Sequence, residues 1–194
     1  MIKEEISDLK KTLDNLVEEK KKVVEIVDLL FLCLKKNKKI LICGNGGSAA
    51  EAEHLSAEFV VRLKPNNNRK ALPLISLTQN SSVLTACGND LGFEKIFSRS
   101  LESMGDKGDI LLVLSTSGNS KNILHVLSTA KKKKIKSIAL LGNSGGKAKS
   151  LSDVNITVPS MDVARVQECH LFLGHYILTQ VEKKLLKNNV LLKL

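Results

Sequence analysis

The sequence predicts an α/β fold with a central parallel sheet of five strands and helices on both faces. Five short aliphatic runs alternate along the chain with stretches of helical periodicity. Each run is hydrophobic throughout rather than at alternate positions, as in strands that are covered on both faces. The connections between the runs are long, which favours crossovers to parallel strands over hairpins. The predicted strands are residues 38–44, 71–77, 109–115, 136–142 and 153–159.

Residues 1–36 form a long predicted helix with a heptad pattern. Its apolar side chains recur at steps of three and four, and the phase resumes after an interruption at Lys20. Such a seam has to be covered, either by the rest of its own domain or by a helix of a partner subunit. The spacing alone leaves both alternatives open. The seam consists of Ile2, Ile6, Leu9, Leu13, Leu16, Val23, Val27, Leu30 and Leu34.

The remaining landmarks are a closing helix and a polar linker. Helical periodicity extends from about Asp162 to Leu186, and the segment from Pro65 to Arg69 has the composition of a linker. With 194 residues and 43% hydrophobic content, the chain is long enough to bury one sizeable core. We therefore expect a single domain over residues 1–194.

The composition also limits where the protein works. The first twenty residues mix charged and aliphatic side chains, which predicts neither a secretory signal nor a membrane span. The cysteines are scattered, without a C-x-x-C pair, as expected for reduced thiols in a core. We therefore expect a cytoplasmic protein with no membrane partner. The four cysteines are Cys33, Cys43, Cys87 and Cys169.

The net charge of +10 raises the question of nucleic-acid binding. The densest basic run, residues 131–134, lies at the end of a predicted helix, where cations favour the negative end of the dipole. The chain has one Tyr, five Phe and no Trp, so the aromatic platforms of single-strand binders are scarce. Nucleic acid is therefore not the expected primary ligand.

Two predicted strands end in loops of small and hydroxyl-bearing residues, GNGGS at 44–48 and STSGNS at 115–120. Glycines let the backbone approach an anion, a following helix adds the positive end of its dipole, and hydroxyl groups donate further hydrogen bonds. Neither loop has the spacing of a nucleotide-binding motif. A helix cap at Ser117 or Asn119 with a turn at Gly118 would also explain the second loop. Together the two loops favour a phosphate monoester.

Four side chains on two predicted helices are candidates for an acid–base or metal site. His54 and Glu58 are four residues apart and therefore about one turn apart on the same face. Gln167 and His175 are eight residues apart, roughly 80° around a helix, so both can lean toward a site between them. Nitrogen and oxygen donors of this kind suit a divalent ion such as Zn²⁺. A solvated glutamate with two satisfied histidines is the alternative.

Four ordered motifs resemble the sugar isomerase (SIS) domain family. They are GNGGSAAEAEHLSAE, GNDLGFEKIFSR, STSGNSKNIL and ARVQECHLFLGH. The resemblance extends from about Leu30 to the C-terminal helix, and the long N-terminal helix also matches. It implies an SIS-type three-layer sandwich around a five-stranded parallel sheet. It also implies a homotetramer with active sites between subunits, in which residues 1–36 serve as an oligomerisation helix.

The resemblance implies a role for each candidate residue. The second loop would hold a substrate phosphate, the first loop would assist, and the GND stretch would contact the sugar. Glu58 would be the catalytic base and His175 the acid, beside one Zn²⁺ per subunit. The substrate-binding positions are Asn45, Gly46, Gly47, Ser48, Glu58, Asn89, Asp90, Ser115, Thr116, Ser117, Ser120 and Gln167. The zinc positions are His54, Glu58, Gln167 and His175.

Within the family, the motifs are similar to those of isomerases that convert sedoheptulose 7-phosphate to D-glycero-D-manno-heptose 7-phosphate through a cis-enediol. This product feeds heptose into bacterial lipopolysaccharide or capsule. The alternative is a non-catalytic SIS relative that binds the replication initiator protein. That relative keeps the R-x-Q-E of the last helix but lacks a histidine matching His175, which this chain has. The resemblance therefore implies an aldose–ketose isomerase.

Overall fold

Five parallel strands form the sheet, in the order β2-β1-β3-β4-β5. The computed structural model describes residues 1–188, so residues 189–194 of the predicted domain lie outside the described residues. Each observed strand falls within one of the five predicted runs. The strands are β1 (Ile40–Gly44), β2 (Leu74–Ser76), β3 (Ile110–Ser115), β4 (Lys136–Gly142) and β5 (Val154–Val158).

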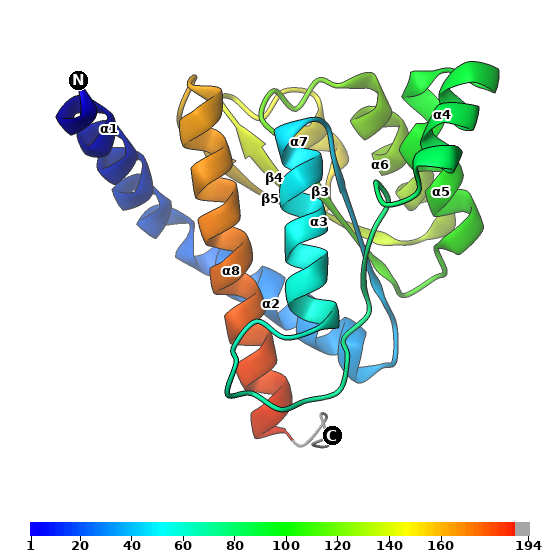
Figure 1. Cartoon of the computed structure of the whole chain (residues 1–194), viewed down its shortest axis with the longest axis horizontal. Coiled ribbons are helices and arrows are strands. Elements are labelled where there is room, and N and C mark those ends of the chain that lie inside the picture. Colours follow the sequence, from blue (N-terminus) through cyan, green and yellow to red (C-terminus); the bar gives the residue numbers. More distant parts are fainter. Residues whose placement is uncertain (189–194) are drawn as a thin grey trace.

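Helices lie on both sides of the sheet and give the molecule three layers (Figure 1). Ile40 and Ile42 of β1 join the core on one face, and Leu41 and Cys43 join the core on the other. This burial explains the uninterrupted hydrophobicity of the strands and confirms the predicted α/β architecture. One layer contains α1 (Ile2–Asn15), α2 (Lys20–Lys35), α3 (Gly47–Val60) and α8 (Val163–Lys187). The other contains α4 (Ser81–Asp90), α5 (Ile96–Met104), α6 (Lys121–Lys133) and α7 (Ala148–Leu151).

Strand β2 is shorter than the predicted strand 71–77. The Leu72 N–H donates to the carbonyl of Phe59 at the end of α3, 3.2 Å away, rather than to a neighbouring strand. The next residue, Pro73, has no N–H to contribute to a ladder. An edge strand tolerates such an interruption, and β2 lies at the edge of the sheet.

A 3₁₀ turn, η1 (Leu16–Glu19), interrupts the N-terminal helix next to the break in the heptad phase at Lys20. Helix α2 packs on α8 and β5 of its own chain and buries its apolar stripe there. Helix α1 projects from the body of the molecule and leaves Ile2 and Ile6 exposed (Figure 1). The chain covers the second half of the seam itself and leaves the start of the first half open.

The predicted polar linker, residues 65–69, ends in a buried arginine. The Arg69 side chain is enclosed and pairs with Glu182 of α8, which is also enclosed. Figure 1 shows the loop between α3 and β2 crossing to the lower part of α8 and back. The linker interpretation was therefore wrong for Arg69. The polar composition of the segment does not reveal this burial, because the glutamate that neutralises the arginine lies 113 residues further along the chain.

All four cysteines are buried free thiols, as predicted. Burial raises the pKa of the Cys33 thiol to about 12 and also raises the pKa of Cys43. Thiols with such high pKa values carry little thiolate at neutral pH. We therefore assign these side chains to packing rather than to chemistry.

Helix α8 begins where the sequence predicted. Asp162 is its N-cap, and its Oδ1 accepts a hydrogen bond of 2.8 Å from the Ala164 N–H. It contains 25 residues. Within residues 1–188, neither α8 nor any other helix combines the length and the apolar surface that crossing a bilayer requires.

Helices α3 and α8 lie side by side and run in the same direction (Figure 1). Gly47 at the start of α3 lies against Gln167, and Leu55 further along α3 lies against Gly174 further along α8. The approach at Gly174 is close, since an added Cβ would lie 2.6 Å from Leu55 Cδ1. A glycine therefore sets the distance between the two helices.

We expect Gly174→Ala to lower the free energy of unfolding by about 1–3 kcal/mol, because an extra methyl group in a packed seam forces the neighbouring atoms to shift. Gly88→Ala is the matched control. Gly88 is also helical, and a Cβ there would meet no atom within 4 Å. This control should gain about 0.5–1 kcal/mol from helix propensity. Urea unfolding followed by circular dichroism measures both values, and equal effects would contradict the contact.

Candidate active site

The two predicted phosphate loops lie next to each other at the carboxyl edge of the sheet. Strands β1 and β3 pair directly, with Gly44 opposite Leu114, so the loops that follow them start side by side. The side chains of Asn45 and Asn122 exchange two hydrogen bonds, of 2.9 and 2.7 Å. Asn45, a predicted substrate contact, thus ties the first loop to the helix that follows the second. Ligands of open parallel sheets bind at this edge.

Hydroxyl groups shape the second loop from within. Ser115 Oγ accepts a hydrogen bond from the Gly118 N–H at 3.1 Å, and Ser117 Oγ accepts one from the Asn119 N–H at 3.2 Å. Because both hydroxyl oxygens act as acceptors here, each still has its hydrogen to donate. Gly118 has a φ of +62°, which favours glycine.

The second loop leads directly into helix α6. Ser120 is the N-cap, so the alternative explanation of the loop as a helix cap at Ser117 or Asn119 does not hold. The first turn of a helix has N–H groups without intrahelical partners, and these favour an anion. Thr116 and Ser120 are half-buried and Ser117 is exposed at this turn, whereas Ser115 is buried beneath it. The loop therefore has the form of a small anion cradle.

The first loop turns into α3 through two glycines. Gly46 has a φ of +54°, and Gly47 is the first residue of the helix. The carboxamide of Gln167 lies against Gly47, where a Cβ would overlap it. Ser48 is buried below the loop. The structure thus brings two of the predicted loop residues and Gln167 together at the start of α3.

His54, Glu58 and His175 meet on the seam between α3 and α8, in what we call the histidine–carboxylate cluster. The Nε2 atoms of the two histidines lie 2.8 Å apart, with the rings edge to face. His54 Nε2 lies 3.8 Å from Glu58 Oε1. One donor atom from each side chain lies within 4.8 Å of the other two. The predicted base and the predicted acid therefore lie next to each other, although they are 117 residues apart in the sequence.

The cluster is accessible to solvent. The side chain of His54 is 45% exposed and that of Glu58 is 25% exposed. Burial, followed by the charge of the neighbouring His54, lowers the pKa of His175. The His175 ring is therefore neutral at pH 7 and keeps a nitrogen lone pair. A carboxylate beside a neutral imidazole can exchange protons with a ligand or hold a metal ion.

The donors of the cluster fit a zinc ion. Imidazole nitrogens and carboxylate oxygens bind Zn²⁺ at about 2.0–2.2 Å, which places the donor atoms of one ion about 3–4 Å apart. The separations of 2.8 and 3.8 Å between the donors of the cluster are close to that range. Three protein ligands leave a coordination position for water or substrate, as in catalytic zinc sites.

Gln167, the fourth predicted zinc ligand, lies away from the cluster. Its carboxamide contacts Gly47, which precedes His54 by seven residues, or about 10 Å along α3. Along α8, Gln167 precedes His175 by eight residues, or about 12 Å. Ligands of one ion lie within about 4 Å of each other. Within one chain, the cluster therefore has three of the four predicted members.

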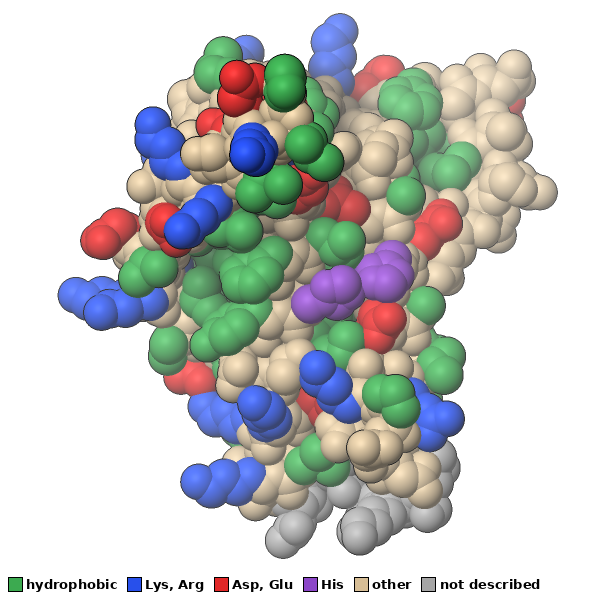
Figure 2. Space-filling view, turned by 60° about the vertical axis from the view of Figure 1, so that its left-hand side comes forward, with side chains coloured by type: hydrophobic (Ala, Val, Ile, Leu, Met, Phe, Trp, Pro, Cys, Tyr) green, Lys and Arg blue, Asp and Glu red, His purple; other side chains and the backbone are tan. Residues whose placement is uncertain are grey.

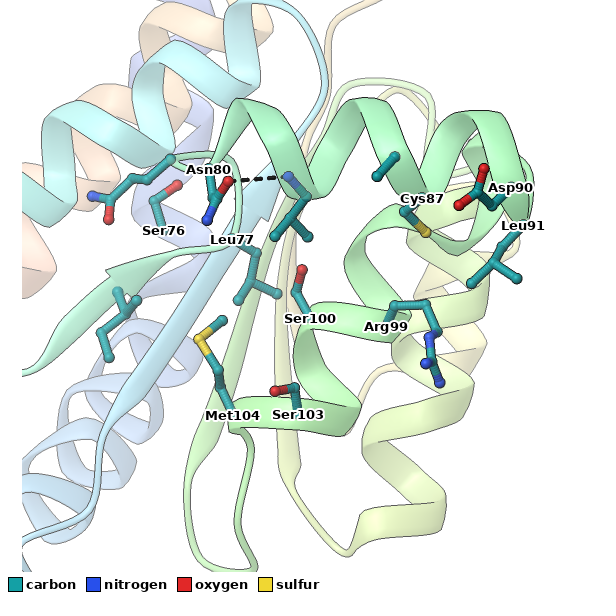
Figure 3. A pocket seen from close by; sticks show the side chains of 14 residues that line it. Ser76, Leu77, Asn80, Cys87, Asp90, Leu91, Arg99, Ser100, Ser103 and Met104 are labelled. Carbon is teal, nitrogen blue, oxygen red and sulfur yellow. Dashed lines mark hydrogen bonds between the residues drawn. The ribbon is translucent and has the colours of Figure 1, made fainter.

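Asn89 and Asp90 end helix α4 on the other face of the sheet. Asn89 Nδ2 donates to Asp90 Oδ1 at 2.7 Å, and both side chains are exposed. Asp90 lines a cavity of about 560 Å³ between α4, α5 and β2, together with Arg99 and Ser100 (Figure 3). Among the described residues, no hydrogen bond or ion pair joins this predicted sugar-binding pair to the histidine–carboxylate cluster.

Two buried ionisable side chains on α3 and α8 were not among the predicted site residues. Glu51 lies on the face of α3 that carries His54 and Glu58, and burial raises its pKa to about 7. His170 of α8 is enclosed, and burial lowers its pKa to about 4. The steps of three and four from Glu51 to His54 and Glu58 place all three on one helix face. This spacing was the signal that could have identified Glu51.

An apolar surface adjoins the histidines (Figure 2). It includes a groove of about 600 Å³ between the N-terminal helices and α8, which we call the α2–α8 groove. Val17, Val24, Phe172 and Tyr176 line this groove and are each about half exposed or more. Contiguous exposed apolar surfaces of this kind are typical of interaction sites.

Comparison with known sequences agrees with the predicted resemblance. Residues 6–142 match the SIS domain. The chain is 43% identical to the phosphoheptose isomerase of Nitratiruptor sp. over 183 residues, which cover 94% of this chain and 97% of that protein. It is 49% identical to the phosphoheptose isomerase of Chlorobium phaeobacteroides over 162 residues, which cover 83% of this chain and 72% of that protein.

Solved structures extend the similarity to three dimensions. A phosphoheptose isomerase from Francisella tularensis superposes with a TM-score of 0.85 at 30% identity, covering 94% of this chain and 98% of that one. The phosphoheptose isomerase from Neisseria gonorrhoeae gives a TM-score of 0.83 at 35% identity, covering 94% of this chain and all of that one. Sequence and fold therefore agree along nearly the whole chain, which belongs to the SIS domain family and, within it, to the phosphoheptose isomerases.

Proposed function

We propose that the protein is an aldose–ketose isomerase that converts sedoheptulose 7-phosphate to D-glycero-D-manno-heptose 7-phosphate. The observation that carries this proposal is the convergence of His54, Glu58 and His175 in a chain so similar to phosphoheptose isomerases. The product would supply heptose for lipopolysaccharide or capsule, and the free cysteines suit the reducing cytoplasm. Because His175 contributes to the cluster, the observations favour an enzyme over a relative that binds the replication initiator.

The two loops would hold the end of the sugar that does not react. Thr116, Ser117 and Ser120 offer hydroxyl groups beside the first turn of α6, whose N–H groups favour an anion. The pair of Asn45 and Asn122 keeps the first loop against the second. Anchoring the phosphate in this way limits the positions that the reacting carbons can take. Part of the binding free energy is thereby used to orient the substrate.

The reaction is a proton shift between neighbouring carbons. Glu58 removes a proton from C1 of the ketose, and the electron pair of that bond moves toward the C2 carbonyl, whose oxygen takes a proton from His175. The cis-enediol then loses the proton of its C1 hydroxyl group to His175. The proton held by Glu58 returns at C2, which leaves an aldehyde at C1. Both side chains end in their starting states.

We further propose that His54, Glu58 and His175 hold one Zn²⁺ per subunit. A bound ion would supply Lewis acidity toward the carbonyl oxygen of the sugar. Gln167 lies two helical turns from the cluster in its own chain, so we infer that it completes the site of a neighbouring subunit. The assignment of the GND pair to the sugar rests on the family resemblance.

A homotetramer with residues 1–36 as its oligomerisation helix is part of the same proposal. The α2–α8 groove exposes apolar side chains beside the cluster, and the start of α1 exposes two more at Ile2 and Ile6. A helix from another subunit would remove both areas from water, at about 25 cal/mol for each Å² of apolar surface. Sites between subunits would also supply the donors that one chain lacks.

Glu58→Gln and His175→Gln should each lower kcat by about 100-fold to 10,000-fold, because each removes a proton-transfer group. Proton NMR of the conversion of sedoheptulose 7-phosphate measures the rate, with hexose and pentose phosphates as competing substrates. Glu25→Gln, on the exposed side of α2, is the matched control and should keep full activity. Wild-type rates in both site variants would rule out the assignment.

Removal of the metal should abolish turnover, and addition of Zn²⁺ should restore it, because the three donors of the cluster fit this ion. The protein is dialysed against a chelator, its metal content is measured by mass spectrometry, and activity is recorded before and after reconstitution. His54→Gln should lower the zinc content without loss of fold. Full activity at zero metal content would reject a catalytic role for zinc.

Val24→Asp and Phe172→Asp should dissociate the oligomer, because each places a charge in an apolar interface. Light scattering coupled to size-exclusion chromatography measures the mass. Leu151→Asp is the control, since Leu151 is an exposed apolar residue on α7, far from the groove in the fold. An unchanged mass in both groove variants would show that the interface lies elsewhere.

A further inference from the structure

A buried ion pair links α8 to the loop that follows α3, and so connects the two helices that carry the histidine–carboxylate cluster. Arg69 is 2% exposed and Glu182 is 0% exposed. The Arg69 Nε donates to Glu182 Oε1, and Asn67 Nδ2 donates to Glu182 Oε2 at 2.6 Å. Both carboxylate oxygens therefore have partners from the loop after α3. An ion pair enclosed in this way is stable only when its remaining hydrogen-bonding groups are satisfied.

The other guanidinium nitrogens of Arg69 donate hydrogen bonds to carbonyl groups at the end of α3. Its Nη1 donates to the Phe59 carbonyl at 2.9 Å, and its Nη2 donates to the Glu58 carbonyl at 3.1 Å. The last four carbonyl groups of a helix lack intrahelical partners. The guanidinium also lies over the ring of Phe59, 5.6 Å from its centroid. Arg69 therefore fixes the backbone of the residue that supplies the candidate base.

On α8, the pair lies beyond the candidate acid. Glu182 follows His175 by seven residues, or two turns, and so lies on the same side of the helix. At the level of the cluster itself, the side chain of Leu55 lies against Gly174 and holds the same two helices together. The seam is thus held by a side-chain contact against a glycine beside the cluster and by an ion pair beyond the cluster.

We propose that Arg69 and Glu182 are positioning residues, which hold Glu58 of α3 at its working distance from His175 of α8. Arg69 belongs to the loop between α3 and β2, and Figure 1 shows this loop crossing to the lower part of α8. A planar fork of donors is required, because one group must reach a carboxylate and three carbonyl oxygens at once, those of Glu58, Phe59 and Lys70. The single ammonium group of a lysine does not reproduce this geometry. This inference rests on the proposed isomerase function.

The test compares Arg69→Lys and Glu182→Gln with Leu101→Ala. Leu101 is fully buried in the core on the opposite face of the sheet, so this control loses stability without touching α3 or α8. We expect kcat to fall about 10-fold to 100-fold in the two seam variants at a temperature where all proteins are folded. The inhibition constant of inorganic phosphate should stay within twofold, because the phosphate loops are remote from the pair.

Two readouts separate positioning from stability. Amide hydrogen exchange at residues 58–61 should be faster in the seam variants than in Leu101→Ala at equal melting temperature. Imidazole ¹H–¹⁵N spectra should show the signals of His54 and His175 shifted in the seam variants alone. A kcat equal to that of the Leu101 control, or a parallel loss of phosphate binding, would overturn the proposal.

The same experiment distinguishes failure of the proposal from failure of the proposed function. If the wild-type protein does not turn over sedoheptulose 7-phosphate, the isomerase assignment is what fails. The exchange rates and the imidazole spectra then still decide the positioning role, because neither depends on catalysis. Unchanged imidazole signals in Arg69→Lys and Glu182→Gln would refute it.

Discussion

The close packing of α3 against α8 is the constraint on which the rest of the site depends. Helices usually pack with their axes about 8–10 Å apart, at a distance set by the side chains between them. Here Gly174 meets Leu55 and Gly47 meets Gln167, and neither contact leaves room for a Cβ on the glycine. Because the helices run in the same direction, these two contacts occur in the same order along α3 and α8. The meeting of two imidazoles on this seam is therefore a consequence of backbone spacing.

The parallel sheet adds a second constraint, which separates the functions along α3. Strands β1 and β3 are neighbours, so α3 and α6 both start at the same edge of the sheet. The start of α3 therefore lies beside the phosphate loops, and each further turn moves about 5.4 Å away from them. Gly47 belongs to the anchoring end, and Glu58 lies three turns later at the reacting end. One helix thus sets the distance between anchor and chemistry.

Much of the fold could be predicted, because buried parallel strands can be recognised in a sequence from their continuous hydrophobicity. The run 136–142 matches β4 residue for residue. The start of β2 could not be predicted in the same way, because the Leu72 N–H turns to a helix carbonyl that only the tertiary structure brings near. Likewise, the polar composition of residues 65–69 predicted solvent contact, whereas Arg69 is neutralised by a distant glutamate.

The same reasoning explains which parts of the site the sequence could predict. The spacing of His54 and Glu58 fixes a common helix face in any context, but the height at which His175 meets that face depends on the direction and offset of α8. Periodicity does not encode that offset, which is why Gln167 was predicted in the cluster and lies two turns from it in the same chain. A phosphate loop tolerates such offsets, because several hydroxyl and N–H donors can share one anion.

Proton transfer is less tolerant, since acid and base must be held within about 0.5 Å of the productive geometry. The two ends of the site are built differently for this reason. The anchoring end is built from turns with glycine at positive φ, and the reacting end from two helices held by a glycine contact and an enclosed ion pair.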